Sequence, residues 1–497
     1  MPENITVGGS ALQIAIFVSL TALIAVLTFW KTRQAKRHDG SEQDVFLAGK
    51  SLSWIFVAGA ITLTNLSTDQ LVGMNGNQML LLAWWEIAGF VGLMTLAFVF
   101  VPLYYRYNCT TVTELLERRY DGRSIRTLIS GIFLVGNILI YLPAALYSGG
   151  LFLQSLFGGD IPILWFSAGL AAIAACYTIF GGLRAVAIMD TFSGIGILAL
   201  ALVIVFLALA VVDFDIVTGV PAERLSMVGS ADSPIPFHTL FTGMAFIQIF
   251  YWSTNQNITQ KAMAAPTVKE AQKGVFAAAA VRILVVPPIV VVPGVVAYKL
   301  FGDVGDAAYG RLVAEVLPQW LSGAFAAMVA AAVITTFSAV LNSTVALYSV
   351  DFHQRFVGEV KNHWKLGAGV SVLATVLAII MVPVFMNAES IINLLQQLNG
   401  LSSMPILSAF IVGLLFRNVA ASSAIAGVVW GIALYGLYTF WPPFPAALGL
   451  HYIDFMVITL ATSILAALAF NRLALGRRAE WLGFALFRKD GGTPLEG

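Results

Sequence analysis

A polar segment interrupts an apolar stretch that is otherwise long enough to cross a membrane. Residues 61–78, with the sequence ITLTNLSTDQLVGMNGNQ, carry one carboxylate, several amides and hydroxyls, and two glycines. A helix facing lipid would leave these groups without partners, and each unpaired polar group in hydrocarbon costs several kcal/mol. The segment therefore predicts a broken helix that lines a wet cavity near the bilayer midplane, as in secondary transporters.

The composition of the 497-residue chain is that of a membrane protein. Its residues are 59% hydrophobic and 11% charged, whereas soluble proteins carry roughly 25% charged residues. The net charge of +1 gives no electrostatic reason to expect nucleic acid as a partner. Cys109 and Cys176 fall in a predicted loop and a predicted span, so no disulfide framework is expected.

Apolar runs long enough to cross about 30 Å of hydrocarbon predict an all-α polytopic protein with about 13 transmembrane helices. The expected boundaries lie at roughly 10–30, 52–78, 80–105, 126–152, 161–181, 185–212, 237–262, 271–300, 321–353, 366–386, 388–416, 420–441 and 452–473. The sequence holds no phosphate-binding loop of the form GxxxxGK(S/T), so ATP-driven pumping is not expected.

Lys and Arg gather in alternate loops, which predicts the orientation of the chain. The loops after the first, third, seventh, ninth and last spans are basic, while the opposite loops hold few basic residues: Arg224, Lys299 and Arg311. Basic loops face the cytoplasm. We therefore expect a multi-pass protein of the cell (inner) membrane with its N-terminus outside and its C-terminus in the cytoplasm.

A second polar segment echoes the first. TNLSTDQ at 64–70 resembles STNQNITQ at 253–260, and each lies within an apolar span. The two spans are five apart, and an odd spacing inverts the second copy in the membrane. Interrupted segments at matching positions in two halves of a chain indicate an inverted repeat with a central binding site.

The ninth span carries hydroxyls that suit a hard cation. Ala332, Thr335 and Thr336 lie at i, i+3 and i+4, on one face of a helix. Two hydroxyls and a carbonyl could supply part of an oxygen cage. Backbone carbonyls near Leu63 and Leu66, freed where the second span unwinds, could supply the rest. The alternative is that these hydroxyls bond to their own helix or allow close helix packing.

Charged groups within apolar context mark further candidate positions. Asp69, Glu86 and Asp190 each need a partner or a wet cavity, because a carboxylate at a helix centre is costly. Asp190 could instead lie near the inner surface beside Arg184. For Arg282, we favour snorkelling to the membrane surface over contact with a ligand.

Neutral hydrogen-bonding groups accompany Glu86. Trp84 or Trp85 could stack on a sugar ring or belong to an interfacial aromatic belt. Amides plus a carboxylate suit a hydroxyl-rich neutral solute. The further amides and phenol are Gln396, Gln397, Gln248 and Tyr251.

These motifs together resemble the sodium/solute symporter family, and within it the sodium–sugar cotransporters. The matching segments are TNLSTDQLVGMNG, FGGLRAV..D, YWSTNQNITQKAMAA, VVPG and TTFSAVLNSTVALYSVD. The resemblance implies a LeuT-type fold with two five-helix inverted repeats at 52–212 and 237–416. An N-terminal helix and cytoplasmic loop (1–51) would precede the repeats. Two helices and a cytoplasmic tail (417–497) would follow them.

The resemblance also implies roles for individual residues. The sodium site would comprise the carbonyls of Leu63, Leu66 and Ala332 and the hydroxyls of Thr335 and Thr336. Solute contacts would fall on Gln70, Glu86 and Gln396, with Asn65 nearby; the residues themselves add Trp85 and Gln248 as candidate solute contacts. Met74 would belong to an outer gate, and Tyr251 would close the site from inside.

Three positions depart from the family pattern. Gly89 stands where some sugar carriers have Ser, and their Lys contact aligns with Ile283, one residue after Arg282. A second sodium site in some relatives would use Asp190 and Ser338, but Ala339 lacks an oxygen. We therefore expect one sodium ion per cycle.

The sequence thus predicts a sodium-coupled symporter, not an enzyme, for a neutral sugar or polyol. Its expected partners are that solute, Na⁺ as the coupling ion, and the lipid bilayer; the oligomeric state is left open. One alternative is a symporter for a carboxylated solute such as sialic acid, proline or pantothenate, with Arg282 as the anion receptor. A passive channel or a membrane-embedded sensor is a second alternative.

Overall fold

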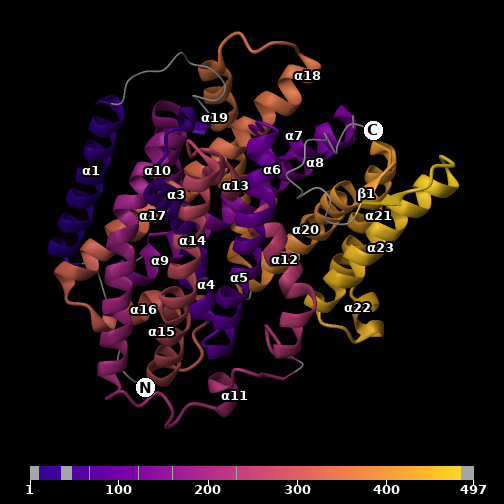
Figure 1. Cartoon of the computed structure of the whole chain (residues 1–497). Helices are drawn as coiled ribbons and strands as arrows, with labels where there is room; N and C mark the ends of the chain where they lie inside the picture. The colour runs from indigo at the N-terminus through magenta and orange to yellow at the C-terminus, as the bar shows by residue number, and fades with distance from the viewer. Residues whose placement is uncertain are drawn as a thin grey trace.

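A computed structural model describes residues 10–34, 47–66, 68–120, 122–158, 161–230, 232–388 and 390–482. Within these ranges, the side chains at 25, 27–34, 48, 63–65, 123, 182–185, 187–188 and 190–193 are not described. The described chain is almost entirely helical. Its helices form one elongated bundle, with α1 (Ala11–Gln34) at one edge and the C-terminal helices at the other (Figure 1).

The first half of the chain contains the first broken helix and the segments that pack around it. Its elements are η1 (Ala48–Lys50), α3 (Trp54–Asn65), α4 (Thr68–Gly76), η2 (Leu80–Leu82), α5 (Ala83–Thr95), η3 (Leu96–Phe100), α6 (Val101–Arg106), α7 (Val112–Tyr120), α8 (Arg123–Gly136), η4 (Asn137–Tyr141), α9 (Leu142–Phe157), α10 (Ile163–Val211) and α11 (Ala222–Leu225).

The second half contains the second broken helix and the C-terminal helices. Its elements are η5 (Phe237–Phe241), α12 (Gly243–Ser253), α13 (Gln256–Met263), α14 (Val268–Leu284), α15 (Val286–Phe301), η6 (Gly305–Ala307), α16 (Ala308–Val316), α17 (Gln319–Ala346), η7 (Leu347–His353), α18 (Gln354–Phe356), α19 (His363–Met386), α20 (Ile391–Leu415), α21 (Ala421–Phe440), α22 (Pro443–Leu448) and α23 (Tyr452–Leu473). A two-residue antiparallel ladder pairs β1 (Phe416–Arg417) with β2 (Glu480–Trp481).

Among the described residues, ten helical segments are long and apolar enough to cross a membrane. They confirm an all-α polytopic architecture. The two predicted spans with polar interruptions are not among the ten, because each is divided into two short helices: α3 with α4, and α12 with α13. The apolar part of α1 is also shorter, at Ala11–Ile24. The total of about 13 spans therefore stays a prediction.

The helix α17 lies at the centre of the bundle. It continues through η7 into α18 as the span Gln319–Phe356, which is the most deeply buried of the ten. It packs against α1, α9, α10 and α19, and also against both broken helices. A helix in this position can present polar groups to a midplane cavity without exposing them to lipid.

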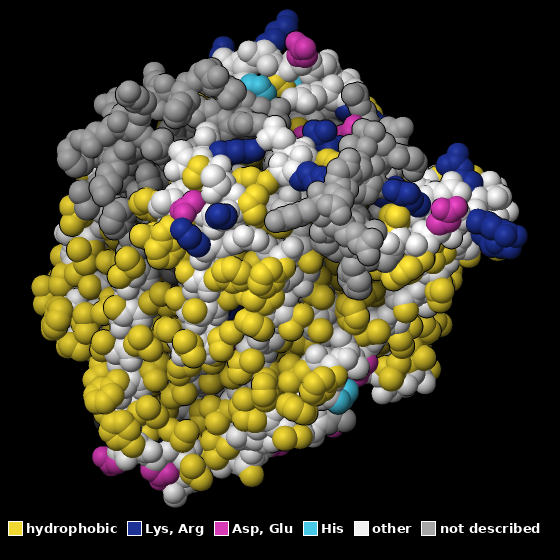
Figure 2. All heavy atoms as spheres, viewed as in Figure 1, with side chains coloured by type: hydrophobic (Ala, Val, Ile, Leu, Met, Phe, Trp, Pro, Cys, Tyr) yellow, Lys and Arg dark blue, Asp and Glu magenta, His cyan; other side chains and the backbone are white. Residues whose placement is uncertain are grey.

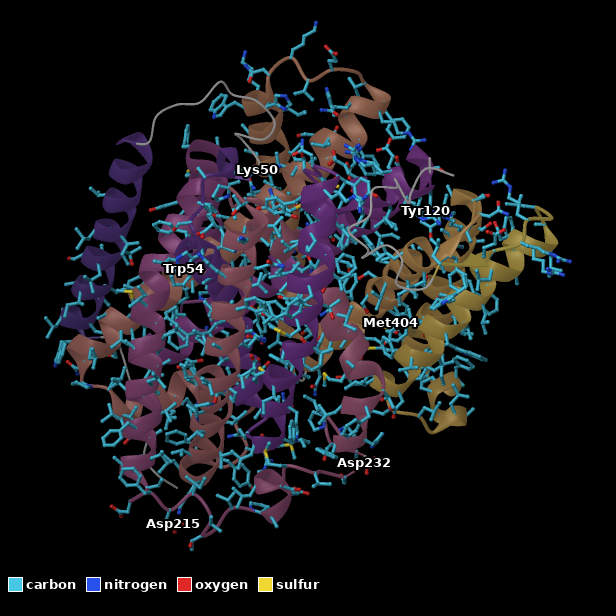
Figure 3. All side chains as sticks on the ribbon, viewed as in Figure 1. Lys50, Trp54, Tyr120, Asp215, Asp232 and Met404 are labelled. Carbon is cyan, nitrogen blue, oxygen red and sulfur yellow. The ribbon has the colours of Figure 1, made fainter. Side chains whose placement is uncertain are left out.

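The two ends of the bundle differ in the charge of their side chains. A broad apolar band separates an upper region with clustered Lys and Arg from a lower edge that shows Asp and Glu (Figure 2). Lys50 and Tyr120 lie toward the upper end, whereas Asp215 and Asp232 lie at the lower end (Figure 3). We call these the basic end and the acidic end.

A side-chain amide joins the first broken helix to α15. Asn75 donates to the carbonyls of Leu71 (2.8 Å) and Ile289 (3.2 Å), and its Oδ1 accepts from the Gly294 N–H at 2.7 Å. The backbones approach so closely that a Cβ on Gly294 would lie 2.4 Å from the Asn75 carbonyl oxygen. Glycine at 294 therefore permits the contact between α4 and α15.

We predict that Gly294→Ala destabilises the protein, by about 1–3 kcal/mol as for other overpacked interiors. Gly169→Ala is the matched control, because Gly169 also lies in a helix but a Cβ there meets no atom within 4 Å. Thermal unfolding of the purified protein should show a lower midpoint for Gly294→Ala only. Equal midpoints for the two variants would contradict the close approach.

Candidate functional site

Both polar motifs contain a helix break. In the first, α3 ends at Asn65 and Leu66 leaves helical geometry with φ −75° and ψ 58°. In the second, α12 ends at Ser253, Thr254 has φ −126° and ψ 0°, and α13 begins at Gln256. The expectation of two interrupted helices is confirmed. Each break frees backbone groups that a continuous helix would have paired.

A buried lysine connects the two broken helices at their halves nearer the basic end. Lys261 on α13 is 1% exposed, and its ammonium group donates to the Ala60 carbonyl on α3 at 3.0 Å. The carbonyl that ends α12 is also satisfied, since the Tyr104 hydroxyl donates to the Ser253 oxygen at 2.8 Å. The second break is therefore stabilised within the protein itself.

The helix α17, which carries Thr335 and Thr336, packs against both halves of the first broken helix. Thr335 donates to the Ala332 carbonyl at 3.1 Å, so one hydroxyl does bond to its own helix. The Thr336 Oγ1 is different, because it is buried and has no hydrogen-bond partner. Leu66 is fully buried, and α17 packs against both α3 and α4. Carbonyl and hydroxyl oxygens are the ligands that a hard cation requires, so this donor set fits Na⁺.

Glu86 and Arg282 form a buried ion pair. The Glu86 Oε2 lies 2.6 Å from the Arg282 Nη2, and both side chains are almost inaccessible to solvent. The expectation that Arg282 snorkels to the surface is therefore wrong: burial makes an unpaired charge so costly that the guanidinium stays beside the carboxylate. Apart from the paired Oε2 and Nη2, the Glu86 Oε1 and the Arg282 Nε form no hydrogen bond among the described residues.

Aromatic and amide groups surround this pair. The Arg282 guanidinium lies 4.5 Å from the ring centroid of Trp252. The indole N–H of Trp252 donates to Gln248 Oε1 at 2.9 Å, and Gln248 Nε2 donates to the Trp85 carbonyl at 2.9 Å. A Cβ on Gly89 would lie 2.9 Å from Arg282 Nε. Gly89 thus gives the guanidinium the space in which it lies.

A second polar group continues from α20. The Tyr141 hydroxyl donates to Asn399 Oδ1, and Asn399 Nδ2 donates to Gln396 Oε1 at 3.1 Å. Tyr251 lies near both Tyr141 and Arg282. Asp69 lies near Tyr141 as well. Tyr141 and Asn399 were not predicted. Asn399 follows Gln396 by one helical turn, whereas Tyr141 gives no local signal.

The structure describes the side chains of some of the other predicted site residues but not of all of them. Gln70 is buried, and its Oε1 has no hydrogen-bond partner. Met74 is buried on α4, on the acidic-end side of the break. The side chains of Leu63, Asn65 and Asp190 lie outside the described residues. The Ser338 hydroxyl donates to the Ala174 carbonyl at 3.0 Å.

Trp84 has a structural contact. Its indole N–H donates to the Met227 carbonyl at 2.8 Å, and its ring packs edge-on against Phe237. These contacts tie η2 and α5 to the long loop at the acidic end. Of the two adjacent tryptophans, Trp85 is the one whose backbone contacts the group around Arg282.

Polar contacts fasten the broken helices at both ends of the bundle. At the acidic end, Asp306 accepts from the Ile391 N–H at 2.9 Å and lies against Gly76, where a Cβ would meet its Oδ1. Burial raises the pKa of Asp306 to about 6. At the basic end, Gln256 accepts from the Val112 N–H at 2.8 Å.

A second contact at the basic end runs through three side chains. Asn257 on α13 donates to Asn137 Oδ1 at 3.3 Å, and Asn137 donates to Thr344 Oγ1 at 3.1 Å. The second broken helix is thereby bonded to η4 and, through it, to α17. We call the Glu86–Arg282 pair and the polar residues around it the central group. These contacts lie toward the basic end, and those of Asp306 lie toward the acidic end.

Comparison with known proteins identifies similar chains. The family model described as "Sodium:solute symporter family" matches residues 45–431. An uncharacterised symporter of Escherichia coli K12, YidK, is 35% identical over 86% of this chain and 78% of its own length. A sodium/glucose cotransporter of Vibrio parahaemolyticus is 29% identical over 95% of this chain and 92% of its own.

A solved structure shares the fold. The outward-open, substrate-bound structure of a Na⁺-coupled sialic acid symporter superposes with a TM-score of 0.79. It covers 95% of this chain and 100% of its own, at 18% identity. The arrangement of the helices is thus that of the LeuT-type transporters.

We predict that Glu86→Gln destabilises the protein by about 3–5 kcal/mol, because it leaves the Arg282 charge buried and unpaired. The double variant Glu86→Gln/Arg282→Gln should recover much of this loss, since it removes both charges. Thermal unfolding midpoints measure both effects. Glu270→Gln removes one partner of a solvent-exposed ion pair with Lys273 and should leave the midpoint unchanged. A double variant less stable than Glu86→Gln would contradict the pairing.

Proposed function

Because the chain belongs to the sodium:solute symporter family, for which Na⁺ is the coupling ion, we propose that its transported solute is a neutral sugar or polyol. The observation that carries this proposal is the neutralised Glu86–Arg282 pair beside unpartnered amide and carboxylate atoms. The pair has no net charge, and the Glu86 Oε1 and Arg282 Nε outside the ion pair have no hydrogen-bond partner. Hydroxyl groups, which donate and accept, complement such atoms.

The amides near the pair extend the same chemistry. Gln70 offers a buried acceptor without a partner, and Gln396 lies one hydrogen bond from Asn399. Trp85 and Gln248 border the pair, and we propose that Asn65 completes the solute site. A carboxylated solute would need the Arg282 fork for itself, and that fork is already balanced by Glu86. The glucose cotransporter of Vibrio parahaemolyticus supports the neutral solute.

We place the sodium site at the first break. Its ligands would be the carbonyls of Leu63, Leu66 and Ala332 with the hydroxyls of Thr335 and Thr336. The unpartnered Thr336 hydroxyl supports this choice over the second break, where Tyr104 already satisfies the Ser253 carbonyl. One ion per cycle is proposed; Asp190 and Ser338 would form any second site.

Transport follows from the position of this ion between two moving parts. An ion that binds α17 and the α3–α4 break more tightly in one conformation shifts the protein toward that conformation. We propose that Na⁺ favours the conformation open at the acidic end, where the solute enters past Met74. Tyr251 then opens the path toward the basic end. The inverted repeats at 52–212 and 237–416 would be the units that move.

The two ends of the bundle support a topology. Positive loops face the cytoplasm, so the basic end would lie inside and the acidic end outside (Figure 2). The helix α1 would then begin outside, and the chain beyond α23 would lie in the cytoplasm. The proposed location is the inner membrane.

We predict that Thr336→Ala raises the Na⁺ concentration for half-maximal uptake by about tenfold, because a bond to a charged group contributes about 1.5 kcal/mol or more. Thr336→Ser should restore the wild-type value. The matched control is Thr459→Ala, which removes a buried hydroxyl that bonds to its own helix. Sodium titration of solute uptake in proteoliposomes measures the effect. Unchanged sodium dependence would remove Thr336 from the site.

We predict that proteoliposomes with an inward Na⁺ gradient accumulate a neutral solute from a panel of D-glucose, D-galactose, myo-inositol, sialic acid, D-glucuronate and L-proline. Collapse of the gradient should abolish accumulation, whereas a passive channel would equilibrate the solute without sodium. Gln396→Ala should reduce uptake of the same solute. If only the carboxylated solutes accumulate (sialic acid, D-glucuronate or L-proline), the transported solute is a carboxylated one and the neutral-solute proposal is wrong.

A further inference from the structure

A cavity of about 420 Å³ opens at the acidic end, beside the central group and not within it. It lies between the first turns of α20, the helices α21 to α23, and the loop that contains Asp232, which Figure 3 places at the lower edge. Its volume is within the range of small-molecule pockets, about 300–1,000 Å³. None of the residues that line it belongs to the proposed sodium or solute site.

Two amides project from one face of α20 into this cavity. Asn393 and Gln397 lie at i and i+4, so they are neighbours about 6 Å apart on the helix surface. Gln396 and Asn399 lie on another face of the same helix, toward Tyr141. The side chains of Asn393 and Gln397 form no hydrogen bond within the described chain. Their donors and acceptors are therefore available to a ligand.

The opposite wall is aromatic and rigid. Tyr438 stacks on Phe455 with ring centroids 4.2 Å apart, and its hydroxyl donates to the Leu450 carbonyl at 2.7 Å. Tyr435 also lines the cavity, but its hydroxyl is buried against α20, where a Cβ on Gly400 would lie 2.2 Å from it. Tyr452 completes this wall, and its ring lies tilted against His451 with centroids 4.5 Å apart. Flat rings of this kind pack against the apolar face of a sugar ring.

The lining carries little charge. Burial lowers the pKa of His451 to about 4, so its imidazole is neutral at physiological pH. Asp232 then provides the one formal charge among the lining residues. With no Lys or Arg in the lining, an anion is not attracted, and one exposed carboxylate is insufficient for a divalent cation.

We propose that this cavity is a second binding site for a neutral polyhydroxylated solute, separate from the central site. The amides of Asn393 and Gln397 and the Asp232 carboxylate would bind hydroxyl groups, while the tyrosine rings would contact the solute's carbon skeleton. The assignment depends on the lining of this cavity alone and not on which solute the central site transports. A bound solute would bridge α20 to α21 and α23, and so link the helix that carries Gln396 to the flanking helices.

Protection of an introduced thiol tests the proposal. Thr439 lines the cavity, and its hydroxyl bonds only to its own helix, so Thr439→Cys is a mild change. Cys176→Ser removes the exposed native thiol. Cys109 can stay, because burial raises the pKa of its thiol to about 12 and suppresses the reactive thiolate. Vesicles of phosphatidylcholine and phosphatidylethanolamine replace maltoside detergents, whose sugar headgroups could occupy the cavity.

The measurement is the rate at which a membrane-impermeant maleimide labels Cys at 439. D-Glucose, D-mannitol and myo-inositol serve as probes. We expect at least one probe to slow labelling by the factor 1 + [L]/Kd, about tenfold at ten times Kd. Val217→Cys, on an exposed loop at the same end, should label at an unchanged rate.

Two variants separate this cavity from the central site. In the Thr439→Cys background, Asn393→Ala/Gln397→Ala should abolish protection by the probe. The thiol at 439 should still be labelled, which shows that the cavity persists. Gln396→Ala should lose uptake but keep protection, with or without Na⁺. The proposal is overturned if no probe protects at about 0.1 M, a hundred times a weak Kd of about 1 mM. It is also overturned if Gln396→Ala alone removes protection. Failure of sodium-driven sugar uptake would refute the proposed function and leave this result standing.

Discussion

The structure depends on the rule that backbone polar groups in hydrocarbon must find partners within the protein. Two helices are interrupted at their centres, so some of their backbone groups lose partners within the helix. Surrounding elements supply hydrogen bonds to such groups. At the second break, Tyr104 bonds to the Ser253 carbonyl, and Lys261 reaches from α13 to the Ala60 carbonyl. On α17, which packs against the first broken helix, the Thr336 hydroxyl is buried without a partner. The two breaks are alike in the sequence, and this difference in hydrogen bonding is the reason that the proposed sodium site is at the first break.

The same rule applies to the charged pair. Glu86 and Arg282 are each too costly to bury alone, and together they still require desolvation. Two further features make the pair possible: the Trp252 ring beside the guanidinium, and the absence of a side chain at Gly89. In the sequence, Gly89 and the arginine one residue before Ile283 belong to separate departures from the sugar-carrier pattern. In three dimensions they are one change, because Arg282 occupies the space that a side chain at 89 would need.

The sequence predicts features that neighbouring residues determine, but not contacts between residues that are far apart in the chain. The broken helices follow from polar residues within apolar runs, and the boundaries of most spans follow from length and hydropathy. The pairing of Glu86 with Arg282, and of Tyr141 with Asn399, joins residues far apart in the chain, and no periodicity reports it. Asn393 and Gln397 show the same limit: the motif NLLQQLNG groups four amide-bearing residues, and only the packing of α20 shows which of them face the central group and which face the outer cavity.

The strength of the contacts at the two ends is compatible with control by one ion. Asp306 fastens the α4 and α20 ends, while Gln256 and Asn257 fasten α13 to Val112 and Asn137. Each hydrogen bond contributes about 0.5–1.5 kcal/mol net, so a few such bonds add only a few kcal/mol at either end. Shifting a two-state equilibrium from 1:99 to 99:1 needs a differential affinity of about 5.5 kcal/mol. A cation held by several oxygens in one conformation and by fewer in another can supply energy on that scale. The contacts at the ends are thus weak enough for the proposed sodium site to open them in turn.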